Sequence, residues 1–220
     1  MFYLLNLSAQ SSGFEKAFKK QYHESLQFIK ENQTLFEKYL VVDNLSWKGC
    51  AAIVFPEIVR YSDIKNFIEV KTLELLYVNG GESYANFSIG RFQMKPSFIE
   101  TLEKQLEKYK YPTKNIFNYK YKDIKEERKE RIKRLSNLTW QLLYLKAFCW
   151  VVQKIFAHKK FNNETERVRF YAAAYNFGFL QSEQKITNWQ SSKSFPYGKI
   201  QPKEKQFIYA EIAVDYFEKK

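Results

Sequence analysis

Turn-forming residues are scarce in this chain, and their scarcity limits the folds that it can adopt. Among 220 residues there are only seven glycines and five prolines. All-β sandwiches and barrels need many tight turns, and such turns depend on these two residues. Hydrophobic residues make up 45% of the chain and aromatic residues 18%, which argues against disorder and provides for a substantial core. The composition therefore favours one mainly α-helical domain.

Apolar residues recur at helical spacing along most of residues 14–220, the range expected to form this domain. The predicted helices span residues 14–40 in one or two pieces, 47–62, 63–78, 97 onward, a charged stretch within 103–134, and then 135–156, 167–177 and 204–217. Pro56 is expected to bend or restart the second helix, and Asn79-Gly80-Gly81 to stop the third. Ser97 and Glu100 have the spacing of a capping box.

The first 13 residues are interpreted as the remnant of a secretory signal peptide or as a disordered tail. MFYLLNLSAQ contains a short apolar run followed by Ser8 and Ala9, small residues of the kind that precede a signal cleavage site. No run in the chain approaches the ~20 apolar residues that a membrane-spanning helix needs, so no integral membrane segment is expected.

The formal net charge of +12 points to an anionic partner. Nucleic acid, an acidic membrane surface and an anionic wall polymer all fit such a charge, although a basic surface also serves solubility alone. The run from residue 108 to 122 alternates lysine with tyrosine, a composition that suits stacking of nucleic-acid bases, and it also fits a solvated helix face.

The cysteine and histidine pattern gives no indication of a metal site or a cofactor. Cys50 and Cys149 lie far apart in apolar runs, which favours buried free thiols, with a single disulfide as the alternative. His23 and His158 are distant from both cysteines, so the ligand spacing of a zinc site is missing.

Three blocks of sequence, in order, resemble the lysozyme-like lytic transglycosylases, a superfamily that includes goose-type lysozyme. AAIVFPEIVRYS, residues 51–62, is similar to the apolar helix that ends in the catalytic glutamate of that family. SIGRFQMKP, residues 88–96, resembles its Ser-x-Gly-x-x-Gln-x-x-Pro block, and AAAYNFG, residues 172–178, its Ala-x-Tyr-Asn-x-Gly block. The resemblance extends over residues 46–217 and implies a lysozyme-like helical domain.

The chain departs from the family pattern around the glutamate. Glu57 is followed by Ile58, where the family usually has serine, and Gln93 follows at a longer spacing that an inserted helix over 63–78 would explain. A Glu-Ser pair does occur at Glu82, but it follows two glycines and indicates a loop. The apolar neighbours of Glu57 favour it over Glu82 as the acid, because burial keeps a carboxyl protonated near neutral pH. Its alternative is an ordinary helix-end glutamate paired with Arg60.

The resemblance implies a peptidoglycan-cleaving enzyme that acts on the β-1,4 bond between N-acetylmuramic acid and N-acetylglucosamine. Glu57 would be the single general acid and base, and the product would be a 1,6-anhydro-muropeptide; a hydrolytic muramidase is the related alternative. No cofactor is implied, and no second carboxylate of the kind that many glycosidases use stands at a motif position. Asp63 and Glu82 are the nearest in sequence. The location implied is the periplasm or cell envelope of a bacterium.

The remaining motif residues would bind the glycan strand. The implied substrate-binding residues are Ser88, Gly90, Gln93, Tyr175 and Asn176. Gly90 would let a sugar ring approach the backbone, Gln93 would bond hydroxyl or acetamido groups, and Asn176 would bind the N-acetyl carbonyl. Tyr175 would hold Glu57 or the acetamido group through its hydroxyl, and Tyr209 loosely resembles a further family tyrosine.

Two other classes of function remain open from the sequence. The first is a catalytically inactive lysozyme-fold protein that binds glycan or acts as a scaffold, which the departures around Glu57 permit. The second is a basic helical nucleic-acid-binding protein, although no recognised motif of that class is present and nucleic acid is not the expected partner. The sequence makes no prediction of the oligomeric state.

Overall fold

The computed structural model describes residues 13–61, 67–196, 202 and 205–219. The expected leader or tail therefore lies outside the described residues, apart from Gly13, as do Asp63 and the start of the segment predicted to be helical from residue 204. None of the helices in the described part of the chain has both the length and the apolar character needed to cross a bilayer.

Within these residues the chain is mainly helical, as predicted, and contains ten α-helices, one 3₁₀ turn and one two-stranded antiparallel sheet. The elements are α1 (Gly13–Glu31), α2 (Gln33–Tyr39), α3 (Trp47–Tyr61), α4 (Phe67–Gly80), α5 (Pro96–Lys108), η1 (Lys114–Phe117), α6 (Ile124–Leu135), α7 (Leu138–Ile155), α8 (Glu164–Phe177), α9 (Glu183–Trp189), β1 (Lys193–Phe195), β2 (Phe207–Ile208) and α10 (Tyr209–Glu218).

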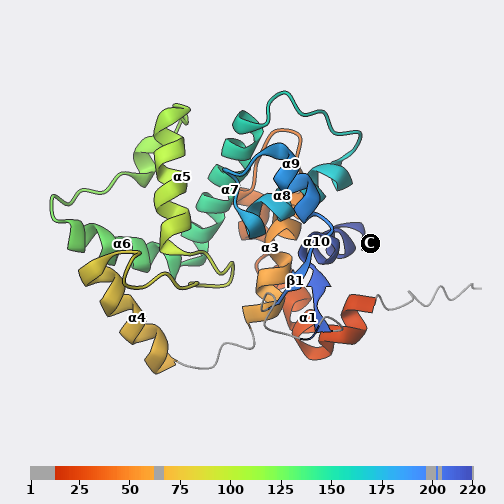
Figure 1. The fold of residues 1–220 in the computed structure, drawn as a ribbon, viewed down its shortest axis with the longest axis horizontal. Coiled ribbons are helices and arrows are strands. Elements are labelled where there is room, and N and C mark those ends of the chain that lie inside the picture. Colours follow the sequence, from red (N-terminus) through yellow and green to blue (C-terminus); the bar gives the residue numbers. More distant parts are fainter. Residues whose placement is uncertain (1–12, 62–66, 197–201, 203–204, 220) are drawn as a thin grey trace, which may run out of the picture.

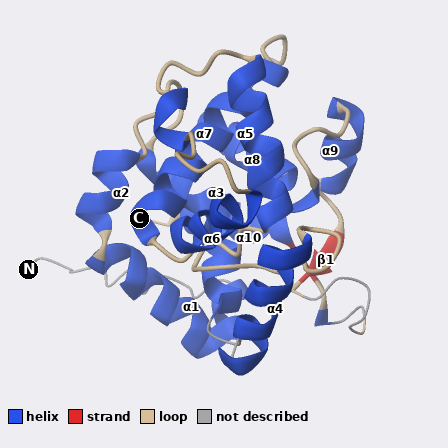
Figure 2. Ribbon diagram, turned by 90° about the vertical axis from the view of Figure 1, so that its left-hand side faces the viewer, coloured by secondary structure: helices blue, strands red, loops and turns tan. Residues whose placement is uncertain are grey.

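The helices form two groups with α7 between them (Figure 1). In the larger group α3, α8 and α10 pack against one another, and α1 covers α3. In the smaller group α4 and α5 both pack on α6. Helix α7 contacts α5 and α6 on one side and α3 and α8 on the other. Seen from the side, α9 stands at the edge of the molecule, close to β1 (Figure 2).

Helix α3 is the buried centre of the larger group because its sequence is apolar on all sides. Every residue from 49 to 59 is buried, Glu57 included. The helix starts where the Ser46 hydroxyl accepts a hydrogen bond from the Gly49 amide, at 3.0 Å, as expected of a capping serine. It continues through Pro56 to Tyr61, so of the two predicted effects of this proline, a bend or a restart, the restart does not occur.

Several predicted helix ends were wrong for local reasons. Helix α5 begins at Pro96, whose fixed φ suits a first helical position, and Ser97 donates to Asn86 Oδ1 at 2.8 Å instead of capping. Helix α7 begins at Leu138 because the Asn137 side chain accepts from the Trp140 amide. The predicted stop after Asn79 is confirmed: α4 ends at Gly80, and Gly81 has a φ of 77°.

A buried ionic network holds the smaller group together. Arg131 of α6, only 3% exposed, binds Glu127 at 2.7 Å on its own helix and Glu103 at 3.0 Å and Glu100 at 3.2 Å on α5. The same guanidinium donates to the Tyr77 hydroxyl of α4 at 2.8 Å. The charged run before α7 is therefore more than a solvated face, since this arginine links three helices.

Some of the tyrosines of residues 108–122 are buried or packed against charged side chains. Tyr111 is buried, and Tyr119 donates to Glu103 at 2.6 Å while the guanidinium groups of Arg131 and Arg134 lie over its ring. Rings in such positions do not offer a free face for base stacking, whereas Tyr121 is exposed.

Cys50 and Cys149 are both buried free thiols, as the sequence favoured. The described residues contain no cluster of three or more histidine, cysteine or acidic side chains that could hold a metal ion.

Candidate functional site

A pocket of about 380 Å³ opens between the two groups of helices. Its walls come from α3, from the segment 88–95, from the first turns of α5, and from the end of α8 with the residues that follow it. Five of the six residues that the sequence singled out lie in these walls: Glu57, Ser88, Gln93, Tyr175 and Asn176. Three blocks that are distant in the chain therefore meet at one cavity.

Glu57 is a buried acid in the walls of this site. It is 5% exposed, and burial raises the pKa of its carboxyl from an ordinary 4.5 to about 7, even though the charges of Arg60 and Lys95 act in the opposite direction. Among the described residues that line the pocket it is the one carboxylate. The alternative acid, Glu82, lies in an exposed turn and does not reach these walls.

Arg60 is the direct charged neighbour of Glu57. Its Nη2 lies 2.7 Å from Glu57 Oε2, one helical turn away on α3, and its Nη1 donates to the Pro196 carbonyl at 3.1 Å. This contact is a close ion pair. The burial expected of a catalytic acid and the arginine pairing expected of an ordinary helix-end glutamate are thus present together.

The segment 89–94 forms a tight turn that carries Gln93 into the pocket. Ile89 and Met94 exchange backbone hydrogen bonds of 2.9 and 3.1 Å, and both Gly90 and Gln93 have positive φ, 71° and 49°. Gln93 Nε2 donates to the Gly90 carbonyl at 2.8 Å. A carbonyl oxygen only accepts, so this bond fixes which end of the Gln93 amide is the nitrogen. The amide oxygen Oε1 is left as an acceptor.

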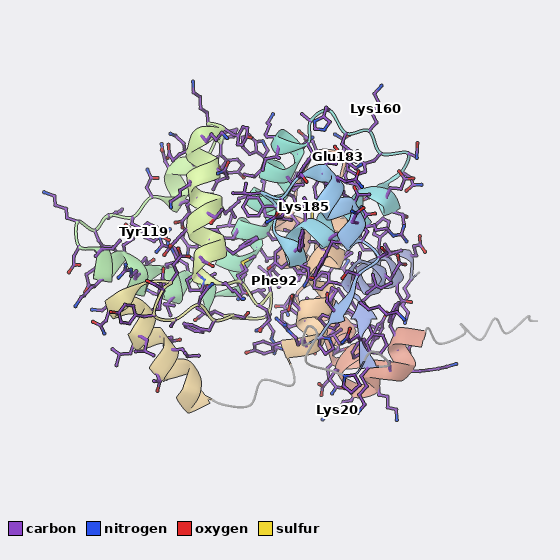
Figure 3. All side chains as sticks on the ribbon, viewed as in Figure 1. Lys20, Phe92, Tyr119, Lys160, Glu183 and Lys185 are labelled. Atoms are coloured by element: carbon purple, nitrogen blue, oxygen red, sulfur yellow. The ribbon has the colours of Figure 1, made fainter. Side chains whose placement is uncertain are left out.

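Two buried side chains from α7 and α8 hold this turn by hydrogen bonds to the backbone of Phe92. Phe92 lies near the middle of the molecule (Figure 3). The Phe92 amide donates to Gln141 Oε1 of α7 at 2.8 Å, and its carbonyl accepts from the Tyr175 hydroxyl of α8 at 2.7 Å. The hydroxyl of Tyr175 is therefore bonded to the turn, and the hydrogen bond to Glu57 that the resemblance implied is not formed in this structure. Tyr175 thus holds the backbone of the residue that precedes Gln93.

Gly90 is required by packing and backbone geometry. A Cβ atom at this position would lie 2.2 Å from Gln141 Nε2 and 2.6 Å from the Leu135 carbonyl oxygen. The positive φ disfavours other residues in addition. The described pocket walls do not include Gly90. Tyr209 also lies outside these walls; it is buried and donates to the Ile53 carbonyl at 3.0 Å.

Three residues that the motifs did not identify contribute to the site. Arg60 and Lys95 bring positive charge into the pocket walls. Trp189 of α9 is outside these walls and contacts Asn176 and Phe177. Arg60 was visible in the sequence as a partner for Glu57 at helical spacing. In the sequence Trp189 appears only as a tryptophan in a polar segment after the block at residues 172–178. This position does not indicate which residues the indole contacts.

No known protein family matches this chain, and none of the curated proteins or solved structures to which it was compared is similar to it. The structure itself establishes a mainly helical fold with a pocket at the three sequence blocks.

Proposed function

We propose that this chain is a lysozyme-like lytic transglycosylase that cleaves peptidoglycan glycan strands in the bacterial cell envelope. The observation that carries the proposal is Glu57: one buried carboxyl, with its pKa raised to about 7, in a pocket whose other walls come from the two remaining motif blocks. A carboxyl with this pKa is protonated to a useful extent near neutral pH, as a general acid must be.

The proposed reaction needs one carboxyl and no water. Protonated Glu57 gives its proton to the glycosidic oxygen, the bond to the anomeric carbon breaks, and the N-acetyl oxygen of the same sugar stabilises the cationic centre. The Glu57 carboxylate then removes the proton from the 6-hydroxyl of that sugar, whose oxygen bonds to the anomeric carbon. The proton balance closes, because Glu57 ends protonated. A single carboxylate among the described pocket residues suits this route better than mechanisms that need a pair.

Arg60 and Lys95 fit the second half of this cycle. Once Glu57 has lost its proton, a buried carboxylate without a partner is costly, and the nearby cations lower that cost. They also hold the pKa of Glu57 below the value that burial alone would give. In the proposed cycle the residue therefore serves both as acid and as base near pH 7.

The polarity of the pocket fits an N-acetylated sugar. Gln93 offers the oxygen of its amide, because its nitrogen is bonded to Gly90, and an acetamido N–H is a donor of the matching kind. Phe98 and Phe179 add apolar surface to the same walls. The positive charge of Lys95 and of the chain as a whole suits the carboxylates of peptide stems.

Binding of glycan without cleavage is the second candidate, and the ion pair at Glu57 favours it. A cation 2.7 Å from Oε2 stabilises the carboxylate form, which cannot donate a proton. Burial opposes this effect and the pKa is still raised, so we place cleavage first.

Release of soluble muropeptides from purified sacculi tests the proposal. Glu57→Gln keeps the size of the side chain and removes the transferable proton, so release should fall by about 10² to 10⁴-fold. The matched control is Glu82→Gln, an exposed glutamate outside the pocket walls, which should stay within a few-fold of the unsubstituted chain. If the unsubstituted chain binds sacculi and releases nothing, binding without cleavage replaces the proposal. If Glu57→Gln remains fully active, Glu57 is not the acid.

A further inference from the structure

The Tyr-Asn block is contacted from outside the pocket by a tryptophan. Trp189, near the end of α9, stacks on Phe177 with ring centroids 4.3 Å apart and an interplanar angle of 17°. Its indole Nε1 donates to Asn176 Oδ1 at 2.9 Å. Asn176 and Phe177 line the pocket, whereas the described pocket walls do not include Trp189. The indole therefore acts on the pocket through two neighbours.

This hydrogen bond determines the orientation of the Asn176 amide. The oxygen and nitrogen of an asparagine amide have almost the same shape, so their assignment follows from their partners. An indole N–H can only donate, so the atom facing Trp189 has to be the amide oxygen. The amide nitrogen Nδ2 then keeps its donors, and among the described residues none accepts from it.

A pocket that presents donors at this point discriminates between ligands. The carbonyl oxygen of an N-acyl group accepts such a bond, whereas a sugar amine in its protonated form carries donors and a positive charge. Arg60 and Lys95 repel the same ammonium group. A polar group left without a matching partner in a binding site costs more binding free energy than a good hydrogen bond contributes. The site is therefore selective for the ligand that matches it.

We propose that Trp189 is a positioning residue that fixes Asn176 as a hydrogen-bond donor and thereby selects N-acylated over de-acylated amino sugars. The proposal rests on the proposed function, because it assumes that the pocket binds an amino-sugar chain. Without the indole donor, the Asn176 amide has no fixed orientation, and part of the population presents its oxygen to the ligand.

Calorimetric titration with two sugars tests this proposal: the trimer of N-acetylglucosamine and the trimer of glucosamine. Trp189→Phe keeps a ring for the stack on Phe177 and removes the donor. It should weaken binding of the acetylated trimer by about twofold, because about half of the Asn176 amides would then present their oxygen, and it should strengthen the weaker binding of the amine trimer. Trp150→Phe, on α7 away from the pocket walls, is the matched control and should behave as the unsubstituted chain.

The coupling between the two residues provides an independent readout. Asn176→Ala should weaken binding of the acetylated trimer, and adding Trp189→Phe should then cost nothing further, because the indole acts only through Asn176. Asn176→Asp keeps an acceptor for the indole and cannot donate, so it should reverse the preference in favour of the amine trimer. This variant keeps the test decisive if Trp189→Phe fails to fold.

The outcomes separate this inference from the function on which it rests. Unchanged affinity of Trp189→Phe for the acetylated trimer, or an equal loss for both trimers, overturns the positioning role and leaves the proposed function intact. A preference of Asn176→Asp for the acetylated trimer overturns it as well. If the unsubstituted chain binds neither trimer, the proposed function fails and the selection role fails with it.

Discussion

Replacing Glu57 by glutamine should change how the stability of the protein depends on pH. The folded-state pKa of Glu57 is raised to about 7, and an unfolded glutamate titrates near its ordinary 4.5. A raised carboxyl pKa means that the folded state keeps the proton where the unfolded state has lost it. Well below pH 4.5 the carboxyl is protonated in both the folded and the unfolded state, so its ionisation does not change the free energy of unfolding. As the pH rises from 4.5 towards 7, ionisation of the carboxyl in the unfolded state lowers the free energy of unfolding. Above pH 7 this loss of stability is complete.

The size of the effect follows from the same two values. Each unit of pKa difference corresponds to 1.36 kcal/mol, so a difference of about 2.5 units gives about 3 kcal/mol at 25 °C. The charged groups that act on Glu57 are Arg60 on its own helix and Lys95 before α5, and both are included in this pKa. Tyr175 and Tyr209 also face it, but burial raises their own pKa values well above 10, so they stay neutral in this range.

Urea unfolding followed by tryptophan fluorescence measures this difference. The free energy of unfolding would be determined between pH 4 and pH 8.5 for the unsubstituted chain, for Glu57→Gln and for Glu82→Gln. The difference in the free energy of unfolding between the unsubstituted chain and Glu57→Gln should change by about 3 kcal/mol across this range, and the glutamine variant should become relatively more stable at high pH. Glu82→Gln should run parallel to the unsubstituted chain.

Parallel curves for the unsubstituted chain and Glu57→Gln would refute the reasoning. They would mean that Glu57 titrates alike in the folded and unfolded states, and that burial does not keep it protonated. A change in the opposite direction, with Glu57→Gln losing ground as pH rises, would mean that the ion pair with Arg60 outweighs desolvation.

Three further predictions concern the neighbours of Glu57, the turn and the charge. Arg60→Met removes a cation that lowers the pKa of Glu57, so the alkaline limb of the activity profile on sacculi should move upward by about one pH unit; an unmoved limb would show that Arg60 does not act on the acid. Gly90→Ala should lower the free energy of unfolding by at least about 2 kcal/mol, because its Cβ would meet the Leu135 carbonyl at 2.6 Å, whereas Gly13→Ala, with no neighbour within 4 Å, should cost nothing. Sedimentation with sacculi should weaken between 0.1 and 1 M salt, since the screening length falls from about 10 to about 3 Å; salt-independent pelleting would contradict an electrostatic contribution.

The sequence was sufficient to place the core helices, and the three resembling blocks suggested part of the pocket walls. Local information decides these features: α3 is apolar on every side, and the two later motif blocks contain their own turn and helix end. The same patterns identified Glu57 by its apolar neighbours, and its burial confirms that part of the argument. The family resemblance of the three blocks suggested that they would come together, although it gave no distance between them.

The features that the sequence missed depend on contacts between distant residues. The Tyr175 hydroxyl was expected to hold Glu57 or the acetamido group, and in the structure it donates to the Phe92 carbonyl. The short pairing of β1 with β2 joins segments too brief to give a periodic signal. Ser97 has the right spacing for a cap, but Pro96 already starts the helix. Trp189 matters only because its indole reaches Asn176, which no local pattern shows.

Mass spectrometry of the muropeptides released from purified sacculi tests the central claim most directly. The account predicts products that end in a 1,6-anhydro sugar, lighter by one water than the corresponding reducing ends, from the unsubstituted chain and from Glu82→Gln. Glu57→Gln should release almost none. Reducing ends in place of anhydro ends would show that water attacks and that the enzyme is a hydrolytic muramidase. Anhydro products from Glu57→Gln at the unsubstituted rate would contradict the assignment of Glu57 as the acid and base of the reaction.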